Sequence, residues 1–301
     1  MSGPSKTSCG FFALIGAPNA GKSTLINCIV GAKVSIVSSK VQTTRTRVLG
    51  ITIREQSQII FIDTPGIFSP KRRLDRAMVA SAWGGASDAD GVILLVDAKR
   101  GISADTRLIV DGLKKQNRKV MLGINKIDLV RKHVLLNLAA SLSETGQFTE
   151  IFMISAETGD GVDDLLDNLT EFLPKGPWLY PEDQISDMPS RLLAAEITRE
   201  KVFQQLHQEL PYAVTVETEK WEQGYDGSAK VNQIIYVQKP GQKAIVLGKG
   251  GAKIKKIGEM ARKELEDLLD HRVHLFLFVK VREKWGDDPE RYSDWGLDFN
   301  A

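Results

Sequence analysis

Two glycine-rich loops with neighbouring lysines stand out in the sequence of 301 residues. The first reads GAPNAGKS over residues 16–23, and the second reads GKGG over residues 248–251. Glycines allow a tight turn whose backbone N–H groups point at phosphate oxygens, and a lysine adds positive charge. Both loops are therefore candidates for phosphate binding, but only the first ends in a hydroxyl residue, Ser23, that can ligate Mg²⁺.

The first loop has the pattern of a glycine, four residues, and then Gly-Lys-Ser. An apolar run, GFFALIG, leads into it and another, LINCIV, follows, as expected for a loop between a strand and a helix. Lys22 would lie against the outer phosphates of a nucleoside triphosphate. The predicted nucleotide-binding residues of this loop are Gly16, Ala17, Pro18, Asn19, Ala20, Gly21, Lys22, Ser23 and Thr24.

Three further motifs, DTPG, NKID and SAETGDG, follow predicted strands, where open α/β sheets bind ligands. Asp63 would hold Mg²⁺ through its water shell, and the Gly66 N–H would bond the γ-phosphate. Asp128 would accept both N–H groups on the Watson–Crick edge of guanine, a pair that adenine lacks, and a backbone N–H near Ala156 would reach the guanine oxygen. The motifs predict a guanine-nucleotide site that also contains Asp63, Thr64, Pro65, Gly66, Asn125, Lys126, Asp128, Ser155 and Ala156.

The motifs lie within an alternation of short β-rich runs and helical patterns. The predicted strands cover residues 10–16, 57–63, 90–97, 119–126 and 150–156, and several are apolar on both faces, as buried parallel strands are. Residues 48–55 fit an extra strand that pairs with 57–63 through a tight turn near Gln56. The pattern predicts a doubly wound, mostly parallel α/β domain.

A different order of elements follows a proline-rich segment, residues 174–190. A helix over 191–210, two strands, a lysine-rich helix over 252–269 and a last strand predict a smaller α+β domain. The expected organisation is a tail (1–9), the α/β nucleotide-binding domain (10–173), a linker (174–190), the α+β domain (191–285) and a second tail (286–301).

The second glycine loop lacks the Gly-Lys-Ser ending, so it cannot be another nucleoside-triphosphate site of the same kind. A GXXG loop between two helical segments clamps the backbone of single-stranded nucleotides in a KH module. A solvated turn is the alternative, but the order of elements, which matches a type II KH domain, favours RNA binding. The predicted RNA-binding residues are Ile245, Leu247, Gly248, Lys249, Gly250, Gly251, Lys253, Ile254, Lys255 and Lys256.

Composition excludes several other classes of protein. Hydrophobic residues make up 42% and charged residues 26%, which is typical of a globular protein, and the apolar runs are too short to span a bilayer. Two cysteines, Cys9 and Cys28, cannot form a disulfide framework, and no Cys or His spacing predicts structural zinc. We therefore expect a cytoplasmic protein. Its net charge of +2 hides a basic stretch, residues 239–258, with six lysines and no acidic residue.

Residues 10–173 resemble a translation-factor-type GTPase domain of the TrmE-Era-EngA type, and nearly the whole chain resembles the Era family of bacterial ribosome-assembly GTPases. The resemblance implies GTP hydrolysis that uses Lys22, Gly66, Asn19 and a threonine of QTTRTR, with Mg²⁺ held by Ser23, Asp63 and that threonine. Thr44 matches best and Thr43 is the alternative. The resemblance also implies binding near the 3′ end of small-subunit (16S) ribosomal RNA, a role in 30S subunit assembly, and peripheral contact with the plasma membrane. We expect a monomer.

One position departs from the pattern of Ras-like GTPases. Ile67 follows DTPG where a glutamine would orient the attacking water, so we expect slow hydrolysis without an activator. Asn19 either caps its loop or, as in relatives with PN at this place, helps to bind K⁺. An RNA-binding factor in which the nucleotide is only structural is the alternative function, whereas a metabolite kinase conflicts with NKID. The acidic tail is either solvated or folds over the basic KH surface.

Overall fold

The structure is a computed structural model that describes residues 7–38, 43–206 and 213–301. The described residues form two compact units, neither of which is continuous in sequence. The first takes in those within Met1–Ser35, Thr44–Asp187 and Tyr292–Ala301, and the second those within Ile36–Thr43 and Met188–Arg291. The expected domain bounds stay a prediction.

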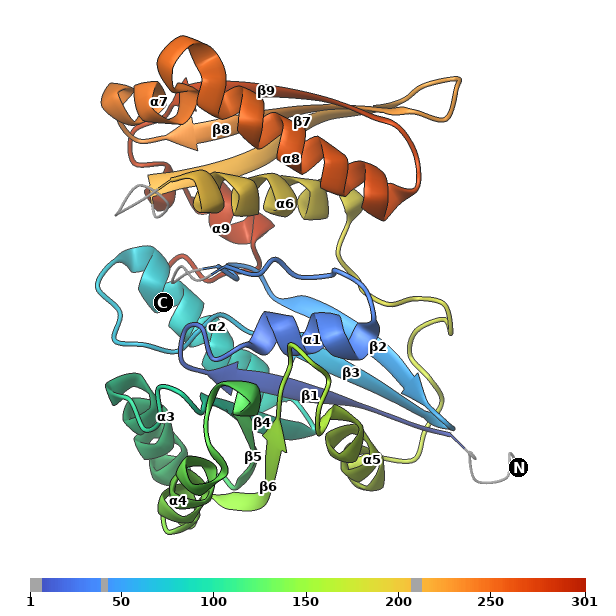
Figure 1. The fold of residues 1–301 in the computed structure, drawn as a ribbon, viewed down its shortest axis with the longest axis vertical. Coiled ribbons are helices and arrows are strands. Elements are labelled where there is room, and N and C mark those ends of the chain that lie inside the picture. The colour runs from blue at the N-terminus through green and yellow to red at the C-terminus, as the bar shows by residue number, and fades with distance from the viewer. Residues whose placement is uncertain (1–6, 39–42, 207–212) are drawn as a thin grey trace. The chain divides into compact units, whose positions relative to one another are not determined.

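The first unit is built on a six-stranded sheet in the order β2-β3-β1-β4-β5-β6 (Figure 1). Every neighbouring pair is parallel except β2 and β3, which turn at Glu55 and Gln56 as predicted. The sheet confirms the predicted doubly wound, mostly parallel fold. Its strands are β1 (Ser8–Gly16), β2 (Val48–Arg54), β3 (Ser57–Asp63), β4 (Gly91–Asp97), β5 (Val120–Asn125) and β6 (Phe148–Ile154).

Helices bury an apolar core on each face of this sheet. Side chains of α2, α3 and α4 pack in one core, and those of α1 and α5 pack in the other. With both faces covered, the carboxyl ends of the parallel strands are left for loops, which is where such sheets bind ligands. The helices are α1 (Lys22–Val30), α2 (Arg73–Asp88), α3 (Ala104–Lys115), α4 (Lys132–Ser143) and α5 (Val162–Phe172), with a 3₁₀ turn at Ile127–Leu129.

The segment after α5 runs along the edge of the sheet without regular structure. Ile51 N–H donates to Ile185 O at 2.9 Å, and Leu49 N–H donates to Asp187 Oδ1 at 3.0 Å. These bonds satisfy backbone groups of the edge strand β2 that would otherwise be free to pair with another chain.

The second unit has a three-stranded sheet in the order β7-β8-β9. β7 (Val214–Gln223) is antiparallel to β8 (Ala229–Val237), and β9 (Val273–Val281) is parallel to β8. Val202, Val246 and Ile257, one from each of three helices, share a core with these strands. The helices are α6 (Ser190–Gln205), α7 (Pro240–Leu247) and α8 (Ala252–Leu269). This order confirms the predicted type II KH domain. The helix predicted over 191–210 ends at Gln205 in the structure, and its predicted end at residue 210 lies outside the described residues.

The C-terminal segment differs from both alternatives considered from the sequence. After the 3₁₀ turn Trp285–Asp287 comes the short helix α9 (Pro289–Asp294), and residues 292–301 belong to the first unit. Tyr292 and Leu297 are buried, and the rings of Tyr292 and Phe299 meet edge to face at 5.0 Å. No helix in the described ranges is both long and apolar enough to span a membrane.

Candidate functional site

The phosphate loop joins β1 to α1 in a conformation that few residues can adopt. Asn19 has φ +66° and Gly21 has φ +98°, both in the left-handed region. A Cβ on Gly21 would lie 2.2 Å from Asn125 Nδ2, so the position accepts only glycine. That amide group donates to Ala20 O at 2.8 Å, which ties the NKID motif to the loop.

Lys22 reaches back over the loop from the first turn of α1. Its Nζ donates to Gly16 O at 3.2 Å and to Ala17 O at 3.3 Å. Burial lowers the pKa of Lys22 from 10.5 to about 8, and the Asp63 carboxylate opposes this shift. The loop thus holds a costly buried cation where phosphate oxygens would stabilise it.

Three hydroxyl groups converge on the carboxylate of Asp63 at the end of β3. Ser23 Oγ and Ser35 Oγ each donate to Asp63 Oδ2 at 2.7 Å, and Thr44 Oγ1 lies 3.0 Å from Ser23 Oγ and 3.5 Å from Asp63 Oδ2. The Thr43 hydroxyl instead donates to Ser38 O at 3.3 Å. Of the two candidate threonines, Thr44 is therefore the one that lies at this carboxylate.

This cluster fits Mg²⁺. Burial raises the pKa of Asp63, an effect that the Ser35 hydroxyl and the Lys22 charge oppose. In the described part of the chain, Asp63 Oδ1 is buried and has no hydrogen-bond partner. Mg²⁺ prefers such hard oxygen ligands and usually keeps several waters, which would satisfy the free oxygen. The sequence did not point to Ser35, because no motif marks it.

The rest of DTPG lies directly against the phosphate loop. Thr64 Oγ1 donates to Leu14 O at 2.6 Å, and Ile67 N–H donates to Gly16 O at 3.0 Å. A Cβ on Gly66 would come within 3.0 Å of Pro18, so the two loops need this glycine to approach. The Ile67 side chain is fully buried in the core and cannot orient a water molecule.

The guanine-specificity motifs meet at the ends of β5 and β6. Asn125 Oδ1 accepts from Ala156 N–H at 2.9 Å, and the Ser155 hydroxyl donates to Asp128 Oδ1 at 2.6 Å. Asp128 itself is exposed, so its second oxygen is available to a base. The structure therefore brings the predicted residues of NKID and SAETG together.

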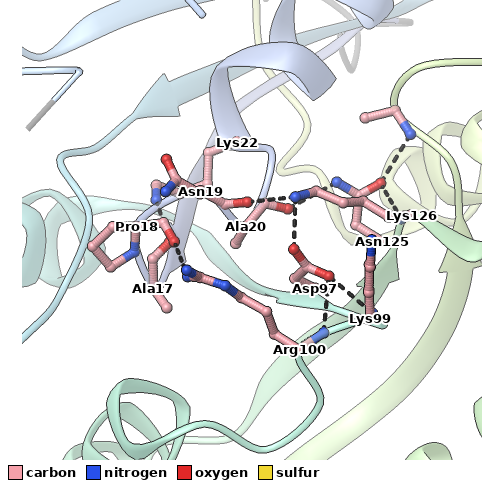
Figure 2. Close-up of polar contacts among 11 residues, drawn as sticks. Ala17, Pro18, Asn19, Ala20, Lys22, Asp97, Lys99, Arg100, Asn125 and Lys126 are labelled. Atoms are coloured by element: carbon pink, nitrogen blue, oxygen red, sulfur yellow. Dashed lines mark hydrogen bonds and ion pairs between the residues drawn. The ribbon is translucent and has the colours of Figure 1, made fainter. Parts of the chain in front are cut away.

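Lys126 and Arg100 reach the phosphate loop from neighbouring strand ends (Figure 2). Lys126 Nζ donates to Asn19 O at 2.8 Å and to Asp97 Oδ2 at 2.6 Å, and Arg100 donates to Pro18 O at 3.2 Å. The other oxygen of Asp97 accepts from the backbone N–H groups of residues 99 and 100. No sequence motif had marked Asp97 or Arg100 as part of the site. The sequence feature that could have revealed them is the acidic residue at the end of β4, because this strand lies between β1 and β5.

The second glycine loop joins α7 to α8 in the KH domain. Gly248, Gly250 and Gly251 have φ values of +73°, +59° and +79°, and a Cβ on Gly248 would lie 2.7 Å from the Cβ of Lys253. Lys249 and Gly250 are exposed, as are Lys255 and Lys256 on the first turns of α8. The loop offers backbone N–H groups and several cations to an extended chain of phosphates.

A groove of about 590 Å³ runs beside this loop, between α8 and β9. Of the predicted RNA-binding residues, Ile254 and Lys255 line this groove, whereas Ile245 and Leu247 do not. Ile245 is 50% exposed on α7, and Leu247 packs against the KH core. The further lining residues, none of them among the predicted RNA-binding residues, are Gly258, Glu259, Arg262, Leu275 and Leu277. The alternation in VHLFLFVKV was the sequence signal for the two leucines.

Comparisons with known proteins agree with this geometry. A family model described as "50S ribosome-binding GTPase" matches residues 11–126, and one described as "KH domain" matches residues 209–286. The fold and the two sites thus define a P-loop GTPase that carries a C-terminal KH domain.

Relatives over the full length narrow the class to one family. The chain is 62% identical to GTPase Era of Sinorhizobium medicae over 97% of its own length and 94% of that protein, and 61% identical to GTPase Era of Agrobacterium fabrum over 97% and 92%. The chain belongs to the Era family and is a GTPase.

Two solved Era structures are similar in fold at 39% identity, each covering 96% of this chain and 99% of its own. One is a single-residue variant of Aquifex aeolicus Era bound to GDP·AlF₄⁻, with a TM-score of 0.90. The other is Era in complex with MgGDPNP and nucleotides 1506–1542 of 16S ribosomal RNA, with a TM-score of 0.91.

Proposed function

We propose that this GTPase is a GTP-driven switch that binds single-stranded RNA from the 3′ region of 16S ribosomal RNA and assists assembly of the 30S subunit. The observation that carries the proposal is the pair of chemically different glycine loops. The first lies beside a buried carboxylate and hydroxyl cluster that suits one Mg²⁺ and one nucleotide. The second is exposed, flanked by lysines and next to an open groove, which suits a polymer.

The roles of the nucleotide-site residues follow from their positions. Lys22 would hold the outer phosphates, Ser23, Thr44 and Asp63 would hold the metal, and Asp128 would read guanine. When bound, Mg²⁺ neutralises charge that develops on the transferred phosphoryl group. The Gly66 N–H would bond the γ-phosphate, but Ile67 supplies no group for the attacking water. We therefore propose slow hydrolysis that an activator accelerates.

Phosphate release from GTP separates this function from the alternative, an RNA-binding factor with a purely structural nucleotide. We expect slow, Mg²⁺-dependent release from the native chain and a loss of at least about a hundredfold in Lys22→Ala, because one buried charged contact to the phosphates is removed. The matched control is Lys99→Ala, an exposed lysine whose side chain has no described polar contact, and it should keep its rate. Equal rates of phosphate release from all three proteins would mean that the nucleotide has only a structural role.

Substitution of Gly250 tests the RNA half of the proposal. Gly250→Asp places a negative charge in the exposed loop without a steric clash, since nothing lies within 4 Å of its added Cβ. We expect loss of RNA binding with unchanged GDP affinity. Gly146→Asp is the control, because Gly146 is also left-handed and open but lies in the first unit. RNA affinity equal to that of the native chain would refute the assignment of this loop.

A K⁺ ion beside the phosphates is a further proposal for Asn19. Its left-handed backbone fits a capping asparagine as well as a cation ligand, so only the ion dependence separates the two. We expect hydrolysis to slow when K⁺ is replaced by Na⁺, and Asn19→Ala to make the two rates equal. Native rates that are equal in both salts would exclude the ion site.

Location and oligomeric state are proposed from the family resemblance alone. We propose a monomer that works in the cytoplasm and contacts the plasma membrane only peripherally. Light scattering should give a single mass near 33.3 kDa. Salt-sensitive sedimentation with anionic vesicles would support the membrane contact, and no sedimentation at low salt would exclude it.

A further inference from the structure

Strand β9 has two chemically different faces. Its odd-numbered residues, from Val273 to Val281, are all apolar, and Val273 and Val279 are buried in the KH cores. The residues at the even positions 272 to 282 are all basic or aromatic, and every one is exposed. We call this set the β9 stripe: Arg272, His274, Phe276, Phe278, Lys280 and Arg282.

The two phenylalanines are the informative members of the stripe. Phe276 is 46% exposed and Phe278 is 51% exposed. Because alternate residues of a strand are about 6.6 Å apart, the two rings can each receive one base of an extended single strand. The Lys230 Nζ lies 5.8 Å from the centre of the Phe276 ring. Exposed aromatic rings with cations around them mark a binding surface.

Charge favours a polyanion on this face. No acidic residue occurs between His271 and Arg282. The acidic side chains paired with basic residues of the stripe are Glu219 of β7, at the opposite edge, and Asp288, which accepts from Arg282 at 2.6 Å. Lys280 pairs with Glu219 at 3.6 Å, but both side chains are more than half exposed, so a phosphate can compete for the lysine.

The stripe is continuous with the groove between α8 and β9. A second hollow of about 400 Å³ shares Arg262 and Leu275 with that groove, and its other lining residues include Arg272, His274 and Phe276 of the stripe. β9 is the edge strand of the sheet, so no further strand blocks the way from one face to the other.

We propose that the β9 stripe extends the RNA site: a strand held in the groove continues around the edge of the sheet and stacks its bases on Phe276 and Phe278. Arg272, Lys230 and Lys280 hold the phosphates on either side of the rings. The proposal rests on the proposed function, since it assumes that the groove binds RNA. The continuity of the stripe with the groove favours RNA over a protein or a membrane as the partner, because one RNA strand could occupy both.

RNA length provides the test. The probes are single-stranded RNAs of about 4, 8 and 12 nucleotides taken from nucleotides 1506–1542 of 16S ribosomal RNA, which occur in the related complex. The full chain should gain affinity with length. In the combined variant Phe276→Ala and Phe278→Ala, the longest RNA should bind about fivefold to a hundredfold more weakly, while the shortest changes less than about twofold.

Two controls separate stacking from damage to the fold. Phe172→Ala removes a phenylalanine of α5 that is 52% exposed and should leave all RNA affinities unchanged. Replacing Phe276 and Phe278 by tryptophan should restore the gain in affinity with RNA length, because tryptophan also stacks on bases.

Several outcomes would overturn the proposal. The same gain with length in the alanine variant, or an equal loss for short and long RNA, would exclude a stacking extension. If the alanine variant no longer bound phosphatidylglycerol vesicles but bound all RNAs as the native chain does, the stripe would be a membrane-binding surface. Normal binding of the shortest RNA without any gain with length would reject only the extension, whereas no RNA binding by the native chain would reject the proposed function with it.

Discussion

Lys22 shows how a buried position gives an ordinary residue a special property. Its ammonium group is held by two carbonyl oxygens of its own loop, and burial lowers its pKa to about 8. The unfolded chain binds this proton up to the usual value of 10.5, so the burial penalty applies fully below pH 8 and is relieved as pH rises toward 10.5. Phosphate oxygens favour the charged form, so nucleotide affinity depends on the same proton.

The affinity for GDP should therefore fall as pH rises from 7 to 9. If bound phosphates keep Lys22 charged, a pKa of about 8 in the free protein predicts a decrease of about tenfold over this range. Calorimetric titrations at several pH values measure it. Lys22→Arg stays charged throughout and is the control, since it also records any loss of protons from guanine itself. A native profile parallel to that of the arginine variant would contradict the prediction.

Asp128 offers a second test at the residue scale. Its carboxylate should accept from the ring N–H and the amino group of guanine, whereas xanthine has an oxygen in place of that amino group. Asp128→Asn should weaken GDP binding at least about tenfold and strengthen binding of xanthosine diphosphate, because the amide can donate. Fluorescence titration with both nucleotides measures the change. A parallel loss for both would mean that Asp128 only supports the loop through Ser155.

At the scale of elements, the C-terminal segment packs on parts of the first unit that carry the nucleotide motifs. The Arg45 guanidinium, next to Thr44 in sequence, lies 5.8 Å from the centre of the Trp295 ring, and that of Arg73 on α2 lies 4.4 Å from the centre of the Phe299 ring. Tyr292 is fully buried where the segment begins. The segment is therefore an integral part of this unit.

Tyr292→Ala should lower the free energy of unfolding of the first unit by about 3 kcal/mol, the usual cost of removing a buried aromatic ring. The relevant denaturant transition is the one that GDP moves to higher concentration. Tyr225→Ala, which removes a fully exposed ring, should change it by less than about 0.5 kcal/mol. Similar effects of the two substitutions would show that the segment contributes little.

At the scale of the whole molecule, residues next to Ser35 and Thr44 in sequence belong to the second compact unit. Ser35 and Thr44 lie at Asp63 in the first unit, whereas the described residues between them, 36–38 and 43, belong to the second. Within the second unit, Val37 N–H donates to Glu200 Oε1 at 2.8 Å, and Arg199 of α6 donates to Thr43 O. A change in the position of Val37 or Thr43 on nucleotide binding would therefore alter these hydrogen bonds to α6.

This connection predicts coupling between GTP and RNA. RNA should change the affinity for a non-hydrolysable GTP analogue by the same factor by which the analogue changes RNA affinity, typically about 5- to 150-fold. Titrations of each ligand with and without the other give both factors. Glu200→Ala should reduce the two factors together, and Asp267→Ala, an exposed acid on α8 that does not line the groove, serves as its control. Analogue affinity that is independent of RNA would exclude coupling.

The sequence by itself determined the two glycine loops, the predicted guanine motifs and the order of elements. These features are local: a glycine pattern fixes a turn, and a strand before it and a helix after it fix the direction of its N–H groups. The absence of a water-orienting side chain was also readable, since the side chain of Ile67 can form no hydrogen bond in any conformation.

Only the tertiary structure decided which distant residues join these loops. Sheet order brought Asp97 and Arg100 to the phosphate loop, and long-range packing placed Ser35 and Thr44 at Asp63. The same holds for the second wall of the KH groove and the exposed face of β9, because a strand's neighbours decide which of its alternate faces is buried. Local patterns fix turns and helices, whereas the pairing of strands far apart in sequence fixes what meets at a site.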